Sequence, residues 1–348
     1  MSILVCLVSQ QAMANVIPAL ELRPEKVVLL TTSREMGTAE NIKKVLNESG
    51  IDTEIFHDLI SPYNLDKIKL IIRKLFDEYK NDMILNVTGG TKTMAISAFE
   101  IFKENNKPVI YYDPDHHSIM SLTNNSEPEK VKNKLDIKSY LKSYGYEIYE
   151  EGTTKGRAES KEKFFAGFDE TRFIEFSLFL DYIRKNYQLN EPRINRSLTG
   201  FTFTKNFDVI RIIDDKSKES LQYDLSTFAF GDWLEDYFYL KLKKENYDDV
   251  KYAVKFKTNG IENEIDVLAS KDCKLFLYSC KSGKSEQKDL MQIDILRKLA
   301  GGIFGKAFFL STSNLGEGSI QRAKILNVNL LTGVDIFNYG SQSRQVGD

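Results

Sequence analysis

Cysteine and histidine are scarce in this sequence, and their scarcity excludes several kinds of site. The 348 residues include three cysteines and three histidines. Cys6, Cys273 and Cys280 are too few and too badly spaced to form a zinc site or a disulfide framework. A reducing compartment such as the cytoplasm fits this usage. Three histidines also give histidine-based catalysis little support.

The sequence also lacks a long apolar run and a strong charge of one sign. The apolar start, residues 3–8, has no basic residues before it and is too short to span a bilayer or to act as a signal peptide. The formal net charge is −2 and the pI is near 6.1. This balance argues against a general nucleic-acid coat protein but leaves room for a local basic groove. We therefore expect a cytoplasmic protein of two or three domains with no membrane partner.

The first third of the chain alternates short apolar runs with amphipathic segments. We predict strands at residues 3–8, 26–30, 51–56, 83–87 and 108–112, and helices at residues 13–20, 38–48, 65–79 and 94–103. Alternation of strand and helix predicts a parallel sheet covered by helices. Ligands of such sheets bind outside the carboxyl ends of the strands.

Residues 88–92, Thr-Gly-Gly-Thr-Lys, join a predicted buried strand to a predicted helix. Gly89 and Gly90 allow a sharp turn, and the helix start directs N–H groups at one spot, which suits an anion. Lys92 and the hydroxyls of Thr88 and Thr91 add donors that suit phosphate. The turn matches neither the P-loop nor the G-x-G-x-x-G pattern, so neither a nucleoside triphosphate nor a dinucleotide is expected. An ordinary strand-to-helix turn explains the two glycines equally well.

Two other polar turns follow predicted strands in the same third of the chain. Ser9 and Gln10 follow the first strand, and Thr32 and Ser33 follow the second. Because the carboxyl ends of parallel strands meet at one edge of a sheet, these turns and the glycine turn should line one pocket.

The middle and the end of the chain differ from the first third. Residues 126–226 carry weak signals, with helices expected at residues 137–146 and 173–187. The last third reads as helix, three strands, helix and two short strands. The predicted helices are residues 227–243 and 287–301, and the predicted strands are residues 250–256, 264–268, 274–280, 308–310 and 328–330.

Two neighbouring strands of the last third carry groups that suit phosphate chemistry. Asp266 lies between Ile265 and Val267, and a carboxylate in an apolar strand needs a partner such as a metal ion. The next strand leads to Lys281, and strand alternation puts Ser279 on the same face. An acid that holds Mg²⁺ or Mn²⁺ beside such a lysine suits phosphodiester hydrolysis. A surface Asp–Lys pair explains the same spacing.

Motifs in the first and the last third of the chain resemble known families. Residues 264–267 (Glu-Ile-Asp-Val), the strand that leads to Lys281 and residues 231–235 (Gly-Asp-Trp-Leu-Glu) resemble the PD-(D/E)xK restriction-endonuclease-like nucleases. Residues 86–94 (Asn-Val-Thr-Gly-Gly-Thr-Lys-Thr-Met), with the first strand leading into Ser9, resemble the CARF domain, which senses cyclic oligoadenylates in type III CRISPR defence. Their order resembles that of the CARF-linked nucleases that cyclic tetra-adenylate activates.

The resemblance implies an α/β protein with three segments. Residues 1–125 would be a Rossmann-like CARF domain, residues 126–226 a linker and intermediate helical segment, and residues 227–348 a restriction-endonuclease-like α/β domain. The nuclease would be a metal-dependent endonuclease with Mn²⁺ or Mg²⁺ as its cofactor.

The resemblance also implies roles for individual residues of the nuclease domain. Asp266 would be the central metal ligand, and the Cys280 carbonyl would be a backbone ligand. Lys281 would be the catalytic lysine and Glu235 the accessory acid and metal ligand.

In the CARF domain the expected ligand is cyclic tetra-adenylate. Its phosphates would contact the turn of Gly89, Gly90, Thr91 and Lys92, with Thr88 preceding it. Its adenines would contact Ser9, Gln10 and the turn of Thr32 and Ser33. A ring with two-fold symmetry suits a homodimer. The substrate would be single-stranded RNA or DNA, whose backbone a lysine-rich stretch would contact; this stretch comprises Lys241, Lys243, Lys244, Lys255, Lys257, Lys271, Lys274, Lys281, Lys284 and Lys288.

One position departs from the nuclease pattern. The family's (D/E)xK motif has an acid where this chain has Ser279. A neutral hydroxyl is a poor substitute for a carboxylate, so we expect weak metal binding and low activity. Glu264, on the same strand face as Asp266 by period-two counting, is an alternative source of the missing carboxylate. Two other functions stay open: a sensor whose nuclease fold is weak or inactive, and a ring nuclease that cleaves the cyclic oligoadenylate.

Overall fold

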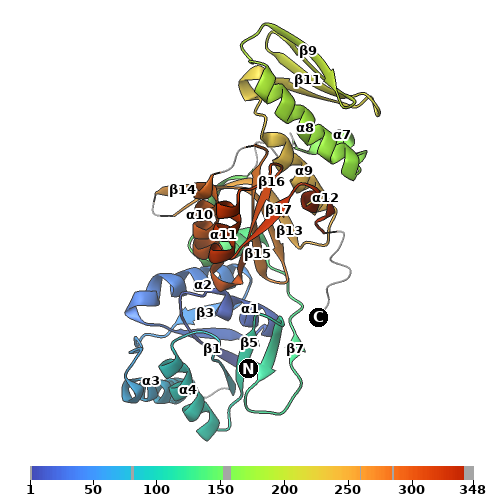
Figure 1. Ribbon diagram of the computed structural model, residues 1–348. Helices are drawn as coiled ribbons and strands as arrows, with labels where there is room; N and C mark the ends of the chain where they lie inside the picture. The colour runs from blue at the N-terminus through green and yellow to red at the C-terminus, as the bar shows by residue number, and fades with distance from the viewer. Residues whose placement is uncertain (1, 80–81, 152–157, 259, 284–285, 341–348) are drawn as a thin grey trace.

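The molecule consists of three parts stacked in a row. The structure, a computed structural model, describes residues 2–79, 82–151, 158–258, 260–283 and 286–340. Figure 1 shows an N-terminal part in blue and teal, a central part in orange and red, and a far part in green and yellow. The last third of the chain therefore lies between the other two parts. Among the described residues, none of the helices combines the length and apolarity that crossing a bilayer requires.

The N-terminal part is built on one seven-stranded sheet, in the order β3-β2-β1-β4-β5-β6-β7. The strands are β1 (Ser2–Leu7), β2 (Lys26–Leu30), β3 (Asp52–Ile55), β4 (Asp82–Asn86), β5 (Val109–Asp113), β6 (Ser118–Ser121) and β7 (Glu129–Lys130). The first five run parallel, as the sequence predicts, and β6 and β7 add an antiparallel edge. The predicted parallel sheet is confirmed.

Helices cover both faces of this sheet. They are α1 (Met13–Leu22), the short η1 (Ser33–Glu35), α2 (Met36–Glu48), α3 (Leu65–Glu78), α4 (Lys92–Glu104) and α5 (Ile137–Ser143). Along β1, Ile3, Val5 and Leu7 belong to the core that includes α3 and α4, whereas Leu4 and Cys6 belong to the core that includes α1 and α2. Burial on both faces explains why this strand is a continuous apolar run.

The central part is a six-stranded mixed sheet in the order β17-β16-β15-β14-β13-β8. Its strands are β8 (Glu147–Glu151), β13 (Asp249–Thr258), β14 (Ile261–Lys271), β15 (Lys274–Lys281), β16 (Gly305–Ser311) and β17 (Val328–Thr332). Its helices are α9 (Asp232–Lys243), α10 (Gln287–Leu296), α11 (Glu317–Leu326) and α12 (Val334–Asn338). The helix predicted at residues 287–301 ends as the π-helical turn η3 (Arg297–Gly301), which η4 (Gly302–Phe304) follows.

The segment 126–226 is not the linker and helical segment that the sequence reading predicts. After β8, which joins the central sheet beside β13, come α7 (Glu162–Ala166), α8 (Glu170–Asn186), β9 (Arg193–Leu198), β10 (Phe201–Asn206), β11 (Val209–Asp214), β12 (Ser220–Asp224) and η2 (Leu225–Thr227). β9 to β12 form an antiparallel sheet. In β10, buried Phe201 and Phe203 alternate with partly exposed Thr202 and Thr204, a period of two that the sequence reading missed.

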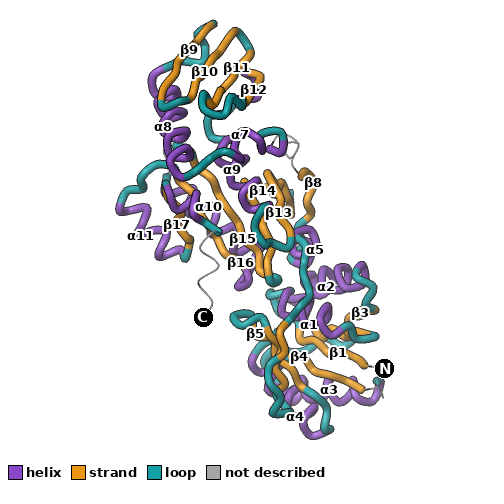
Figure 2. Tube along the Cα trace, turned by 90° about the vertical axis from the view of Figure 1, so that its right-hand side faces the viewer, coloured by secondary structure: helices purple, strands orange, loops and turns teal. Residues whose placement is uncertain are grey.

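Aromatic side chains join this small sheet to the central part. The Phe176 ring on α8 lies 5.0 Å from that of Phe201 in β10 and 5.1 Å from that of Trp233 in α9, between centroids. Figure 2 shows α8 extending from the small sheet toward the central part. One apolar core thus runs through both parts, and α8 packs against α9 and α12 of the central part.

Candidate functional site

The glycine turn between β4 and α4 packs directly on the end of β1. A Cβ atom at Gly89 would lie 2.2 Å from the Leu7 carbonyl oxygen, and one at Gly90 would lie 2.8 Å from Leu7 Cβ. Gly90 also has a φ of +76°, which residues with side chains rarely adopt. Only glycine fits at both positions, so the turn can pack directly on Leu7.

The threonine hydroxyls of this turn are engaged within the protein. Thr88 Oγ1 donates to Asn86 Oδ1 (2.6 Å) and accepts the Tyr112 N–H (2.7 Å). Thr91 caps α4, and its hydroxyl donates to the Pro62 carbonyl (2.8 Å). These hydroxyls shape the turn, a role different from the phosphate contacts that the sequence reading assigns to them.

Lys92 is the first residue of α4, and its side chain is exposed. Within the described part of the chain, its amine forms no hydrogen bond or ion pair. The positive end of a helix dipole disfavours a cation at this position. An exposed lysine placed there suits an anion that approaches the turn from outside.

The other two polar turns lie at the same edge of the sheet. The Val8 N–H donates to the Leu30 carbonyl (2.9 Å), which keeps the ends of β1 and β2 side by side. Gln10 and Ser33 are exposed and Ser9 is half-buried. Thr32 is buried, and its hydroxyl accepts the Glu35 N–H (3.3 Å) as the cap of η1. The Thr32 hydroxyl is therefore engaged in capping η1, and Ser33 is the exposed side chain of this turn.

Two buried asparagines that the sequence reading missed join the glycine turn to the end of β1 and the start of α1. Asn86 Nδ2 donates to Asn15 Oδ1 (3.1 Å) and to the Ala14 carbonyl (2.8 Å). Asn15 Nδ2 donates to the Leu7 carbonyl (3.0 Å). Both amides are fully buried, where an unpaired amide would be costly. Asn86 could have been recognised in the sequence, because it is an amide side chain within the apolar run just before the glycine turn.

The N-terminal part touches the central part through η4. Gln11 Oε1 accepts the Ile303 N–H (3.0 Å), and the Tyr112 ring stacks on that of Phe304, with centroids 6.0 Å apart. At Gly302, whose φ is +56°, a Cβ atom would lie 2.3 Å from Gln11 Oε1. Because Tyr112 also donates to the glycine turn, a continuous set of contacts joins the turn to η4.

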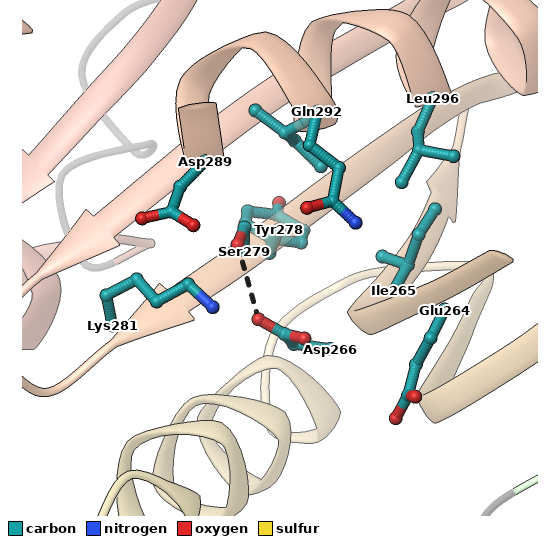
Figure 3. Close-up of a pocket in the computed structure, with 10 residues that line it drawn as sticks. Glu264, Ile265, Asp266, Tyr278, Ser279, Lys281, Asp289, Gln292 and Leu296 are labelled. Carbon is teal, nitrogen blue, oxygen red and sulfur yellow. Dashed lines mark hydrogen bonds between the residues drawn. The ribbon is translucent and has the colours of Figure 1, made fainter. Parts of the chain in front are cut away.

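In the central part, Asp266, Ser279 and Lys281 lie together where β15 ends (Figure 3). Asp266 Oδ2 accepts the Cys280 N–H (2.6 Å) and the Ser279 hydroxyl (3.4 Å). The Lys281 carbonyl accepts the Thr312 N–H (3.2 Å) on the β16 side. Since backbone groups of successive strand residues point to alternate sides, the Cys280 carbonyl points toward the side that holds Asp266.

Two carboxyl groups of this site have raised pKa values. Burial, together with the negative charges of Asp266 and Asp232, raises the pKa of Glu235 on α9 to about 9. Burial also raises the pKa of Asp266, although the Cys280 N–H and the Lys281 charge oppose the shift. Glu235 thus belongs to the same electrostatic site. A bound cation would relieve the repulsion between the two carboxyl groups.

The donor atoms of the site suit a hard divalent cation. Carboxylates of Asp266 and Glu235, the Ser279 hydroxyl and the Cys280 carbonyl are oxygen ligands of the kind that Mg²⁺ and Mn²⁺ prefer. A small cavity of about 50 Å³ lies against Asp266, Ser279 and Lys281, with room for an ion. Over the residues that the structure describes, no three His, Cys, Asp or Glu side chains are close enough together to hold a metal. The donor atoms are of the type that such an ion prefers, but the side chains would have to move closer together to coordinate it.

Glu264 lies on the same strand face as Asp266, as period-two counting predicts, and its negative charge raises the pKa of Asp266. Its side chain is exposed, and its carboxylate points away from Ser279 and Lys281, although it borders the same cavity (Figure 3). Asp289 of α10 borders the cavity from the other side, and its carboxylate points toward Ser279 and Lys281.

The chain after Lys281 is anchored from the far part of the molecule. Arg184 of α8 donates to the Ser282 carbonyl (2.7 Å), and the Ser282 hydroxyl donates to the Phe230 carbonyl (2.9 Å). A Cβ atom at Gly283 would lie 2.1 Å from the Arg184 guanidinium, so any other residue here would displace the Arg184 side chain. Sequence reasoning missed Arg184, because nothing in the sequence connects α8 with the end of β15.

A larger open cavity adjoins this anchor. Arg184, Lys185, Ser313, Asn314 and Gly316 are among the residues that line its 640 Å³. Asp181 also lines this cavity and pairs with both Arg184 and Lys185. Four lysines of the predicted nucleic-acid stretch likewise form ion pairs, each with a glutamate, and Lys284 lies outside the described residues. The pairs are Lys243–Glu159, Lys244–Glu162, Lys255–Glu150 and Lys288–Glu286. Ion pairing therefore does not favour one of these two surfaces over the other for contacting a phosphate backbone.

Comparisons with known families match both α/β parts. Residues 3–140 match the family model described as the Card1 CARF domain, and residues 223–338 match that described as the Card1-like endonuclease domain. The two matches together confirm the resemblance to CARF-linked nucleases. No curated protein sequence matches the chain.

Solved structures share the fold over nearly the whole chain. Can2 from Sulfobacillus thermosulfidooxidans, in complex with cyclic tetra-adenylate, has a TM-score of 0.75 at 23% identity and covers 99% of both chains. Protein VC1899 from Vibrio cholerae has a TM-score of 0.77 at 19% identity and covers 99% of this chain and 97% of its own. A type III CRISPR defence DNA nuclease activated by cyclic oligoadenylate has a TM-score of 0.55 at 16% identity; the match covers 90% of this chain and 46% of that nuclease.

Proposed function

We propose that this chain, which joins a Card1-type CARF domain (residues 3–140) to a Card1-like endonuclease domain (residues 223–338), is a nuclease of type III CRISPR defence that cyclic tetra-adenylate activates. Its substrate would be single-stranded RNA or DNA, and its cofactor Mn²⁺ or Mg²⁺. The observation that carries the proposal is the set of contacts that runs from the glycine turn through Tyr112 to η4, which continues from α10, the helix beside the nuclease site. The complex of Can2 with cyclic tetra-adenylate supports the choice of ligand.

In the CARF pocket the chain's own groups bind and orient the ring. The exposed Lys92 amine and the N–H groups of the glycine turn contact phosphate, while the exposed Gln10 and Ser33 lie where adenines would contact the adjoining turns. Thr88 and Thr91 act indirectly by fixing the shape of the turn. Asn15 and Asn86 fix the glycine turn against the end of β1, so this side of the proposed site needs no rearrangement to bind.

In the nuclease site each residue has a separate task. Lys281 contacts the scissile phosphate or orients the attacking water, since its amine lies between Asp266 and Asp289 in Figure 3. Asp266, Glu235 and the Cys280 carbonyl would hold the divalent ion, which supplies positive charge against the negative charge that develops on phosphate. Because the pKa of Glu235 is about 9, this side chain releases a proton near neutral pH when it becomes a ligand.

The contacts between the domains provide a route for activation. α10 borders the active site and continues through η3 into η4, which Gln11 and Tyr112 touch. π-helical turns often occur at functional sites. Ligand occupancy would favour one arrangement of η4 and α10, and it can shift this equilibrium only by its difference in affinity for the two arrangements.

Gln11→Ala should reduce activation more than ligand binding. The variant loses the hydrogen bond to Ile303, worth about 1 kcal/mol, so cleavage at saturating ligand should fall about fivefold. Gln10→Ala, at the neighbouring exposed position, should instead weaken ligand binding and leave cleavage at saturation unchanged. Calorimetry and cleavage rates over a ligand titration separate the two effects. Equal behaviour of the two variants would argue against a coupling role for Gln11.

The homodimer has support in an exposed apolar stripe. Met291, Ile295, Leu299 and Ile303 follow one another at intervals of four residues along α10, η3 and η4. Their exposed fractions are 48%, 53%, 48% and 68%. Single exposed apolar residues are ordinary, but a contiguous row marks an interface. The stripe ends at Ile303, whose N–H bonds to Gln11 beside the proposed ligand site. A second copy bound along the stripe would therefore contact α10 near the nuclease site and η4 near the ligand site.

Ile295→Glu should convert the dimer to monomer and abolish activation by the ligand. A carboxylate in the centre of an apolar interface would have to lose its hydration without a partner. Light scattering after gel filtration gives the oligomeric state. Ile325→Glu on α11, where the exposed fraction is 78%, is the matched control and should stay dimeric. Dimers formed equally by both variants would exclude the stripe as the interface.

Cleavage of labelled single strands in Mn²⁺, with and without a panel of cyclic oligoadenylates, tests the proposed function. Cleavage only with cyclic tetra-adenylate is the expected result. Ligand binding without cleavage at any metal concentration would favour a sensor with an inactive nuclease fold, which Ser279 makes the main rival. Linear products from labelled cyclic tetra-adenylate would instead reveal a ring nuclease.

A further inference from the structure

We propose that Asp289 supplies the carboxylate that the nuclease site lacks at Ser279. The inference rests on the proposed nuclease function and names one more residue of its active site. Asp289 lies in the first turn of α10, outside the two strands that carry the sequence motif.

The position of Asp289 fits this role. Its side chain borders the same cavity as Asp266, Ser279 and Lys281. Figure 3 shows its carboxylate pointing toward Ser279 and Lys281, on the side of the Lys281 amine opposite to Asp266. An acid that reaches the cavity from α10 can therefore serve where the (D/E)xK motif places one on the strand.

Asp289 is also held in place. One carboxylate oxygen, Oδ2, accepts the Glu286 N–H (2.8 Å) in the capping box of α10. Across the described residues, the other oxygen accepts no hydrogen bond. A carboxylate fixed by one oxygen and open at the other is prepared to bind a cation without losing much side-chain freedom.

Apart from the two aspartates, the side chains that line the cavity do not place a negative charge next to Ser279 and Lys281. Ser279 has a neutral hydroxyl, and Gln292 beside it has a neutral amide. Glu264 is exposed and points away from Lys281 (Figure 3). With Asp289, the site regains the negative charge that a Mg²⁺ or Mn²⁺ ion requires.

The location on α10 also explains why no three acid side chains cluster within the described residues. α10 continues into η3 and η4, where the CARF domain touches it through Gln11. A small shift of α10 on ligand binding would bring Asp289 toward Asp266. The metal site would then be complete only in the activated arrangement.

Direct Mn²⁺ binding to the full-length protein, measured from the electron paramagnetic resonance signal of free Mn²⁺, tests the assignment. With saturating cyclic tetra-adenylate, Asp289→Asn should bind Mn²⁺ at least about tenfold more weakly than the parent. Asparagine keeps the acceptor for the Glu286 N–H, so the melting temperature should stay unchanged. Glu264→Gln is the matched control, and its Mn²⁺ affinity should stay within about twofold of the parent.

Adding Ser279→Glu to Asp289→Asn should restore Mn²⁺ binding, because it returns the acid to the motif position. Parent-like Mn²⁺ binding by Asp289→Asn, or a loss that Glu264→Gln reproduces, would overturn the assignment, as would a double variant that binds no better than Asp289→Asn. Cleavage is measured separately on the same proteins. If Mn²⁺ binding depends on Asp289 but no protein cleaves single strands, the acid assignment stands and the proposed nuclease function fails.

Discussion

Asp266→Ala should abolish cleavage activated by cyclic tetra-adenylate and leave binding of the ligand unchanged. The Asp266 carboxylate is the half-buried acid of β14 beside Lys281, and its pKa is raised by burial. Loss of the bound ion would remove several kcal/mol of transition-state stabilisation; about 4 kcal/mol corresponds to about a thousandfold in rate. Single-turnover cleavage measures the first effect and calorimetry with cyclic tetra-adenylate measures the second.

Asp266→Asn separates the loss of charge from the loss of a structural contact. Alanine leaves the Cys280 N–H without its acceptor, whereas asparagine can still accept this hydrogen bond through its amide oxygen. Both variants should be inactive, but only the alanine variant should melt at a lower temperature. Glu264→Gln, two residues away on the same strand, should keep activity within about twofold. An asparagine variant that cleaves at the parental rate would refute the nuclease assignment.

Local patterns predicted the elements that carry the site. β1 and β4 are apolar runs because both their faces are buried, and the glycine turn was recognisable because the chain bends where β1 leaves no room for a Cβ atom. Asp266 and Lys281 stand out in the sequence because charged residues within or next to apolar strands are rare. In each case the structural requirement acts on neighbouring residues, so the sequence records it locally.

Contacts between distant segments could not be predicted in this way. Gln11 and Ile303 are 292 positions apart, and the Arg184 contact with Ser282 crosses from α8 to the end of β15. In the sequence, Asp289 looks like an ordinary acid in the first turn of a helix, because its part in the capping box is enough to explain an aspartate there. Nothing local indicates that it also borders the cavity. These roles depend on how the parts pack, which no local pattern encodes.

Residue type alone does not show which hydroxyls are engaged within the protein. Thr91, expected to contact phosphate, and Thr32, expected beside an adenine, both cap helices in the structure. Threonine is favoured at helix caps for the same reason that it suits an anion site, since its hydroxyl bonds well to backbone and to oxygen groups. Lys92 does not have two such roles, because its side chain is exposed and a cation at a helix start does not cap the helix.

Lys92→Ala should weaken binding of cyclic tetra-adenylate by about 1.5–3 kcal/mol per subunit, the contribution of a hydrogen bond to a charged group. This corresponds to about 10- to 150-fold for each subunit, and a symmetric ring would meet Lys92 of both subunits. The active site is untouched, so high ligand concentrations should restore full cleavage. Calorimetry gives the affinity, and a ligand titration of cleavage gives the recovery.

Two controls distinguish a lost contact from a disturbed helix. Lys103→Ala, about 16 Å further along α4, removes an exposed lysine from the other end of the same helix and should leave ligand affinity unchanged. Lys92 opposes the helix dipole at its position, so Lys92→Ala should melt at the parental temperature or slightly above it. Weaker binding by a protein that is at least as stable can then come only from the missing charge. Unchanged affinity in Lys92→Ala would place the phosphates elsewhere than at the glycine turn.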